Sequence, residues 1–206
     1  ESKDAGDSDL WIIKLDKQGN KVWDRTYGGS GDDVACSLIQ TTDGGYTVAG
    51  YTTSKGSGNY DVWLIKLDNK GNKIWDRTYG GSNEDLAYSL IQTTDNGYAV
   101  AGRTESKDAG DSDLWVIKLD GQGNKIWDRI YGGSSNDKAT SLIQTTDGGY
   151  AVAGYTESKG AGRIDTWITK LDNKGIITWD KTYGGSNYDG ASSLIQTTDG
   201  GYAVAG

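Results

Sequence analysis

The stretch Trp75–Ser82, with the sequence WDRTYGGS, decides the fold because it recurs at a fixed interval. Close copies of it begin at Trp23, Trp127 and Trp179, so successive copies start 52 residues apart. The chain of 206 residues is therefore almost four copies of one unit. An exact period of this size is typical of an array of supersecondary units that share one core.

Outward from this octapeptide, each unit contains four stretches with the composition of β-strands. In one copy they are residues 61–68 (DVWLIKLD), 73–79 (KIWDRTY), 86–93 (LAYSLIQT) and 97–102 (GYAVAG). They are short, rich in β-branched and aromatic residues, and alternate with the period of two that is typical of strands. Glycine-containing turns such as the Asp-Gly pair within Thr41–Tyr46 separate them. The pattern therefore predicts that each unit is a four-stranded antiparallel meander.

A repeated four-stranded meander without helices predicts an all-β, four-bladed β-propeller formed by one domain over residues 1–206. The predicted blades cover residues 1–29 with 186–206, 30–81, 82–133 and 134–185. An open solenoid is the rival, but it needs polar capping units, and the terminal sequences here are ordinary repeat sequence.

The chain begins inside the unit and ends two residues short of completing its fourth copy. We therefore expect the terminal strands to complete the first blade, with residues 201–206 pairing with residues 9–16. The same complementary ends could pair between two chains and form an eight-bladed ring, so both closures stay open.

Two motifs carry a resemblance to known propellers. The pattern LDxxGxxxW, present at Leu15–Trp23 and Leu67–Trp75, resembles the outer hairpin of quinoprotein-type blades. The turn within Thr41–Val48 resembles the Asp-box of sialidase-like propellers. The whole unit looks like the Trp-rich repeats of secreted or surface-anchored bacterial and archaeal propeller proteins, which implies an extracellular or cell-surface location and specifies a blade without an activity.

Composition excludes several classes of function. A net charge of −8 argues against nucleic acid as a partner, and no apolar run is long enough for membrane insertion. The chain has no His and a single Cys36, which removes Ser-His-Asp catalysis and nearly all zinc, copper and haem chemistry. We therefore expect a protein that is not an enzyme.

One set of aspartates repeats in the loop before the third stretch of each unit, namely Asp33, Asp85, Asp137 and Asp189. In a four-fold ring these carboxylates would surround one mouth of the axis, where they could bind Ca²⁺. Alternatively, each aspartate accepts backbone hydrogen bonds within its own Gly-Gly-Ser loop, as aspartates commonly do in turns. No other cofactor is expected.

The copies differ mainly in two loops that the predicted blade order places on one face. The variable residues that could bind a ligand there are Tyr60, Tyr88, Tyr188, Asp32 and Glu84. Binding residues often lie on loops above a rigid scaffold, although exposed loops also drift freely after duplication.

These features favour a non-enzymatic structural or adhesive repeat module of a secreted or cell-surface protein, within a longer array or an extracellular fibre. Its expected partners are other copies of the protein, through the terminal strands, or surface glycans. The first alternative is a lectin-like propeller that binds glycans on its variable face. The second is a carboxylate-dependent glycoside hydrolase, since Asp and Glu are plentiful.

Overall fold

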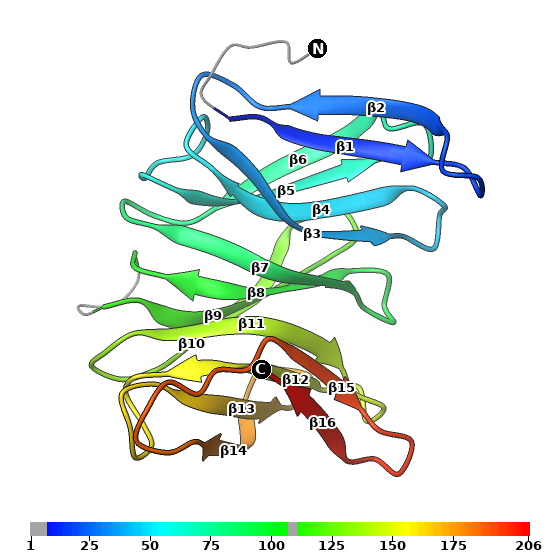
Figure 1. Ribbon diagram of the computed structural model, residues 1–206. Coiled ribbons are helices and arrows are strands. Elements are labelled where there is room, and N and C mark those ends of the chain that lie inside the picture. Colours follow the sequence, from blue (N-terminus) through cyan, green and yellow to red (C-terminus); the bar gives the residue numbers. More distant parts are fainter. Residues whose placement is uncertain (1–7, 107–110) are drawn as a thin grey trace. The chain divides into compact units, whose positions relative to one another are not determined.

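The computed structural model describes residues 8–106 and 111–206, which form sixteen β-strands and no helix (Figure 1). None of the described segments is a helix that could cross a membrane. The strands are β1 (Leu10–Leu15), β2 (Lys21–Tyr27), β3 (Asp33–Gln40), β4 (Tyr46–Thr52), β5 (Asp61–Leu67), β6 (Lys73–Tyr79), β7 (Asp85–Gln92), β8 (Tyr98–Thr104), β9 (Asp113–Leu119), β10 (Lys125–Tyr131), β11 (Asp137–Gln144), β12 (Tyr150–Thr156), β13 (Asp165–Leu171), β14 (Ile177–Tyr183), β15 (Ser193–Gln196) and β16 (Tyr202–Ala205).

The strands form three four-stranded antiparallel sheets, β3–β6, β7–β10 and β11–β14, each in simple sequential order. Two further sheets have only two strands, β1–β2 and β15–β16, and are called the half-sheets below. The predicted all-β architecture of repeated antiparallel meanders is confirmed.

Short turns with left-handed residues connect the strands. Gly44 ends one hairpin with φ 80° and Gly71 ends the next with φ 78°, a conformation that costs glycine little. Asn96 occupies the position equivalent to Gly44 and keeps a φ of 61°. Asparagine tolerates this region better than most residues, so the turn survives the substitution.

The contacts divide the chain into two compact units, residues 1–87 and 88–206, with the boundary inside β7. The single propeller domain over residues 1–206 stays a prediction from the sequence. In the first unit the apolar core gathers around Trp63 and Ile65, and in the second around Trp167 and Val152. Aromatic side chains bury large areas, which compensates for the low apolar content of the chain.

Among the described strands, β1 forms a sheet with β2 and β16 forms a sheet with β15, and the predicted pairing of residues 201–206 with residues 9–16 stays a prediction. Each half-sheet is a local hairpin, whereas joining β16 to β1 would pair strands from opposite ends of the sequence. The structure therefore shows the repeated antiparallel sheets, each described by itself.

Candidate functional site

The predicted metal-binding aspartates hold their own loops. Asp33 is buried at the start of β3, where its Oδ2 accepts hydrogen bonds from Gly29 N at 2.9 Å and Ser54 Oγ at 2.7 Å, and Thr52 Oγ1 donates to its Oδ1. The same amide-to-carboxylate bond recurs from Gly81 to Asp85, from Gly133 to Asp137 and from Gly185 to Asp189. Each carboxylate thus fixes the Gly-Gly-Ser loop that leads into its strand.

A second carboxylate, which the sequence did not single out, lies beside Asp85, Asp137 and Asp189. It stands at the start of β5, β9 and β13, is buried, and belongs to Asp61, Asp113 and Asp165. Asp61 Oδ2 accepts from Ser57 N at 2.9 Å and Gly58 N at 3.1 Å. A Cβ on Gly80 would lie 2.2 Å from Asp61 Oδ1 and 2.6 Å from Asp85 Oδ2. Only glycine fits between the two carboxylates.

The paired carboxylates are the place where the predicted Ca²⁺ site can be compared with the structure. The residues described include no group of three or more Asp, Glu, Cys or His side chains arranged to hold a metal ion. Ca²⁺ takes six to eight oxygen ligands, and the carboxylates here already accept bonds from backbone amides. The arrangement stabilises two loops in each repeat.

The aspartates of one hairpin in three of the repeats form ion pairs with buried lysines. Asp95 Oδ1 accepts from Gly97 N at 3.0 Å, and its Oδ2 pairs with the ammonium of the buried Lys118 at 2.8 Å. Burial raises the pKa of Asp95, but the hydrogen bonds from Lys118 and Thr93 outweigh it and lower the pKa to about 2. Equivalent ion pairs join Lys66 to Asp43 and Lys170 to Asp147.

The other hairpin uses its aspartate differently. Asp68 Oδ1 accepts from the backbone N of Lys70 and of Asn72, each at 2.8 Å, and Asn72 Nδ2 donates to Oδ2. These bonds lower the pKa of Asp68. The aspartates of both hairpins therefore hold the turns that contain them.

The variable residues lie where two neighbouring loops meet. Tyr60 forms an isolated parallel bridge with Glu84, Asp32 does so with Ser8, and Tyr188 with Ile164. The structure thus brings Tyr60 and Glu84 together and places Asp32 and Tyr188 at equivalent bridges of other repeats. Tyr60 also packs edge-on against Tyr51, with ring centroids 5.3 Å apart.

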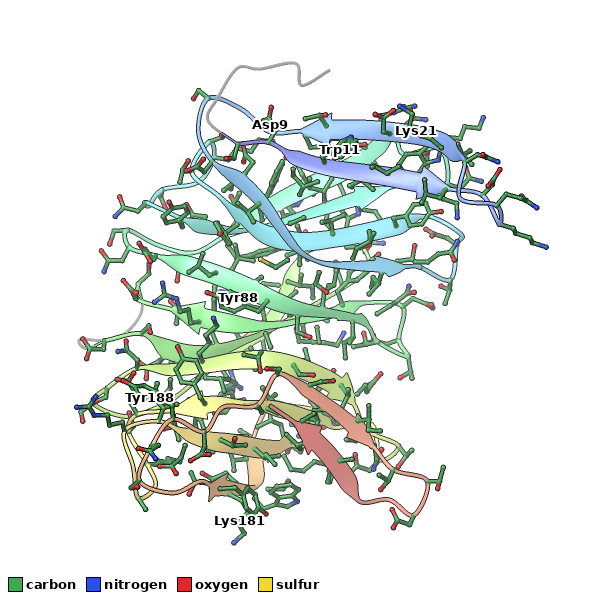
Figure 2. The ribbon with its side chains drawn as sticks, viewed as in Figure 1. Asp9, Trp11, Lys21, Tyr88, Lys181 and Tyr188 are labelled. Atoms are coloured by element: carbon green, nitrogen blue, oxygen red, sulfur yellow. The ribbon has the colours of Figure 1, made fainter. Side chains whose placement is uncertain are left out.

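Tyr88 and Tyr188 differ in how far they are engaged, and both are labelled in Figure 2. The Lys138 ammonium lies 3.7 Å from the centroid of the Tyr88 ring, a cation–π contact that covers this ring. Tyr188 is 64% exposed. Of these two tyrosines, Tyr188 offers the freer aromatic surface.

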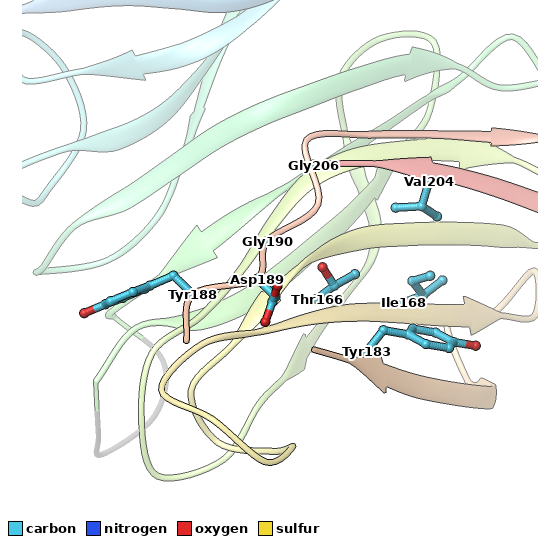
Figure 3. Close-up of a pocket in the computed structure, with 8 residues that line it drawn as sticks. All are labelled: Thr166, Ile168, Tyr183, Tyr188, Asp189, Gly190, Val204 and Gly206. Carbon is cyan, nitrogen blue, oxygen red and sulfur yellow. The ribbon is translucent and has the colours of Figure 1, made fainter. Parts of the chain in front are cut away.

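Tyr188 borders a pocket of about 320 Å³ in the second unit (Figure 3). Thr166 and Ile168 of β13, Tyr183 of β14 and Val204 of β16 line it, together with Asp189. Sequence reasoning missed this pocket because its lining comes from strands that look like ordinary core strands.

Sequence reasoning also missed the paired carboxylates and the buried lysines. The signal was available, since Asp61 and Lys66 stand at fixed places in a strand that repeats in the chain. Charged residues at fixed places in an otherwise apolar strand indicate a buried partner.

No family model matches the chain. It is similar to the regulatory protein FlaEY of Caulobacter vibrioides, with 26% identity over 216 residues. That match covers 86% of this chain and 22% of the relative, so the chain spans about a fifth of the relative's length. In fold it is similar to a protein of unknown function from Bacteroides caccae, with a TM-score of 0.56 and 11% identity, over 98% of this chain and 62% of that one.

Proposed function

We propose that this chain is a non-enzymatic structural repeat module of a larger secreted or cell-surface assembly, and that its sheets are blades of a propeller-type array. The observation that carries the proposal is the use of the repeated carboxylates. Asp33, Asp61 and Asp43 each accept hydrogen bonds that hold a loop of their own repeat. Carboxylates that accept backbone hydrogen bonds in this way stabilise the fold of the repeat.

The comparisons support the modular part of the proposal. The relative from Caulobacter carries the similar stretch within a much longer chain and is named a regulatory protein. A module that presents repeated sheets inside a larger protein could serve regulation by holding partners, without chemistry of its own.

The test is thermal unfolding of the wild type and of Asp137→Asn, with and without added Ca²⁺. A scaffold role predicts that the variant melts at a lower temperature in both buffers, because Asn is a weaker acceptor for Gly133 N and Ser158 Oγ. Asp32→Asn, in the variable loop, is the matched control and should melt close to the wild type. A Ca²⁺-dependent rise in the wild-type melting temperature that the variant loses would replace the scaffold role with a metal site.

A glycan-binding role is the second candidate, and the exposed ring of Tyr188 beside the pocket favours it. Aromatic faces next to polar loops can stack on sugars. A glycan array probed with the wild type and with Tyr188→Ala tests this role. Binding that the variant loses would support it, and the absence of binding to every glycan would remove it.

A further inference from the structure

The turn between β7 and β8 differs from its copies at one residue (Figure 1). The equivalent turns have the sequence TTDGGY at residues 41–46, 145–150 and 197–202, whereas residues 93–98 are TTDNGY. Asn96 therefore stands where the other repeats have glycine. Among residues 8–106 and 111–206 it is the one residue other than glycine with a left-handed φ, 61°. The substitution creates an Asn-Gly link that occurs once in the chain.

Packing requires glycine at the second position of this link. Gly97 is buried, and a Cβ on it would lie 2.3 Å from Leu119 O and 2.6 Å from the Lys118 ammonium. The Leu119 oxygen belongs to the backbone of β9, so it cannot move aside without disturbing that strand. Asn96, by contrast, is exposed to water. With asparagine at position 96, the link is therefore necessarily Asn-Gly.

An Asn-Gly link can react with itself, because glycine has no Cβ to hinder the approach of its nitrogen. The Gly97 nitrogen bonds to Asn96 Cγ, the bond from Cγ to the side-chain nitrogen breaks, and ammonia leaves with the proton that Gly97 N gives up. Water then opens the resulting five-membered imide at either carbonyl. The products are aspartate or isoaspartate, in which the main chain runs through the former side-chain CH₂. Water is the only co-reactant, and Asn96 is exposed to it.

The hairpin holds the attacking nitrogen in a hydrogen bond. Gly97 N donates to Asp95 Oδ1 at 3.0 Å, and the ammonium of Lys118 lies 2.8 Å from Asp95 Oδ2. Burial raises the pKa of Asp95, but hydrogen bonds from Lys118 and Thr93 lower it to about 2, so this carboxylate is a weak base toward the amide. The Asp95 carboxylate therefore retains the N–H in its hydrogen bond instead of removing the proton.

The two products differ in their effect on the turn. Thr93 N donates to Gly97 O at 3.0 Å, and the loop that this bond closes contains residue 96. Isoaspartate adds one carbon to the main chain of that loop and so loosens the turn. Aspartate keeps the main chain and tolerates a left-handed φ, and it places a second negative charge next to Asp95.

We propose that Asn96 is a site of spontaneous modification, at which its link to Gly97 deamidates through the cyclic imide. The ion pair of Asp95 with Lys118 slows this reaction by keeping the Gly97 amide in a hydrogen bond. One repeat carries the site, and the inference is independent of the structural function proposed above. The other three turns have glycine at the reacting position, namely Gly44, Gly148 and Gly200.

Peptide mass spectrometry of the folded protein, kept at mildly alkaline pH, tests the site. Replacement of the amide by a carboxyl raises the mass of the peptide that contains Asn96, and fragmentation distinguishes aspartate from isoaspartate. Asn124 is the internal control and should change more slowly, because its Nδ2 donates to Asp120 Oδ2 at 2.8 Å and Lys125 follows it. Asn96→Gly, which restores the sequence of the other turns, should show no mass gain. If Asn96 stays intact for as long as Asn124, the proposal is overturned.

Asp95→Ala tests the restraint on the reaction. It removes the acceptor of the Gly97 amide, so deamidation in the folded protein should become about tenfold faster, the factor expected for a hydrogen bond to a charged group. Asp147→Ala is the matched control, because it removes the equivalent ion pair with Lys170 from a turn without asparagine. It should leave the rate at Asn96 unchanged. Equal acceleration by both variants, or a slower reaction in Asp95→Ala, would overturn the restraint.

Lys118→Met keeps the restraint testable if Asp95→Ala does not fold, since it leaves the carboxylate and removes only its cation. Circular dichroism shows whether each variant keeps its strands. We expect deamidation in Lys118→Met to be faster than in the wild type, and an unchanged rate would contradict the role of the ion pair. None of these outcomes affects the melting test of Asp137→Asn with Ca²⁺, so the two proposals fail separately.

Discussion

β5 and β1 have nearly the same sequence and very different surroundings. Every residue of β5 is buried between strands on both edges, whereas β1 buries only Leu10 and Ile12 and exposes Trp11, Ile13 and Leu15. Both strands form, because the alternation of side chains and the hairpin turns are local features of the sequence. Their burial differs, because β5 pairs with a strand on each edge and β1 pairs with β2 alone among the described strands. In a repeat array, the formation of a strand therefore does not by itself determine how much that strand stabilises the fold.

The outer strands show the same contrast. Tyr131 on β10 is buried, and burial raises the pKa of its phenol well above the usual range. Tyr183, at the same position on β14, is exposed. This tyrosine is buried where its hydroxyl donates to the hairpin of the following repeat, as Tyr131 does to Gly175 O.

The largest expected effect comes from truncating the same tryptophan in the two settings. Trp115→Ala removes a buried ring from the four-stranded β7–β10 sheet and should lower the free energy of unfolding by about 3–5 kcal/mol. Trp11→Ala removes an exposed ring and should cost less than about 1 kcal/mol in the dilute single chain. Chemical denaturation measures both values. Equal losses would show that β1 is already packed as fully as β9.

A smaller effect should come from the loop carboxylates. Asp137 is buried and accepts from Gly133 N and Ser158 Oγ, so Asp137→Ala should cost about 2–3 kcal/mol. Asp189 makes the equivalent bond with Gly185 in a more exposed loop, so Asp189→Ala should cost about 1 kcal/mol. Urea unfolding of the two variants checks the ranking. A larger loss at Asp189 would contradict the view that the half-sheets are the less stable part.

Much of the fold could be predicted from the sequence because its determinants are local. The period of two, the Asp-Gly turns and the exact repeat are sufficient for four-stranded antiparallel meanders. Closure could not be predicted, because pairing of residues 201–206 with 9–16 depends on free energies of non-local association that repeat identity does not contain. Trp11 illustrates this, since its sequence context matches that of Trp63 while its burial does not.

The candidate site was predictable only in part. The turn role of Asp43 follows from its place beside Gly44, since Asp-Gly pairs are typical of hairpin turns. The pairing of Asp61 with Asp85 was not predictable, because it joins two loops through a contact across Gly80. The pocket beside Tyr188 could not be predicted, because its lining comes from strands that have the sequence of ordinary core strands.

The acid dependence of stability should also differ between a four-stranded sheet and a half-sheet. Burial raises the pKa of Asp76, but hydrogen bonds from Lys55, Lys73 and Trp63 outweigh it and lower the pKa to about 2. The stabilisation is therefore present above the unfolded pKa of 3.8 and is lost as the pH falls through about 2. Asp76→Asn should be about 1–2 kcal/mol less stable than the wild type at neutral pH, and the gap should close across this range.

Asp24, at the same position on β2, is the comparison for this pH series. The hydrogen bond from Lys21 lowers its pKa, but the group is exposed to solvent and screened. Asp24→Asn should therefore differ from the wild type by less than Asp76→Asn at every pH. Unfolding curves between pH 2 and pH 7 measure both gaps, and a larger gap for Asp24 would reverse the expected order.

The smallest expected effect separates two hairpin glycines. Gly19 and Gly71 both have a left-handed φ, 83° and 78°, so alanine at either position should cost about 1 kcal/mol from backbone strain. Gly71→Ala should cost a further fraction of a kcal/mol, because its Cβ would crowd the Trp23 ring, whereas Gly19 faces open space. Thermal unfolding of the dilute chain measures the difference.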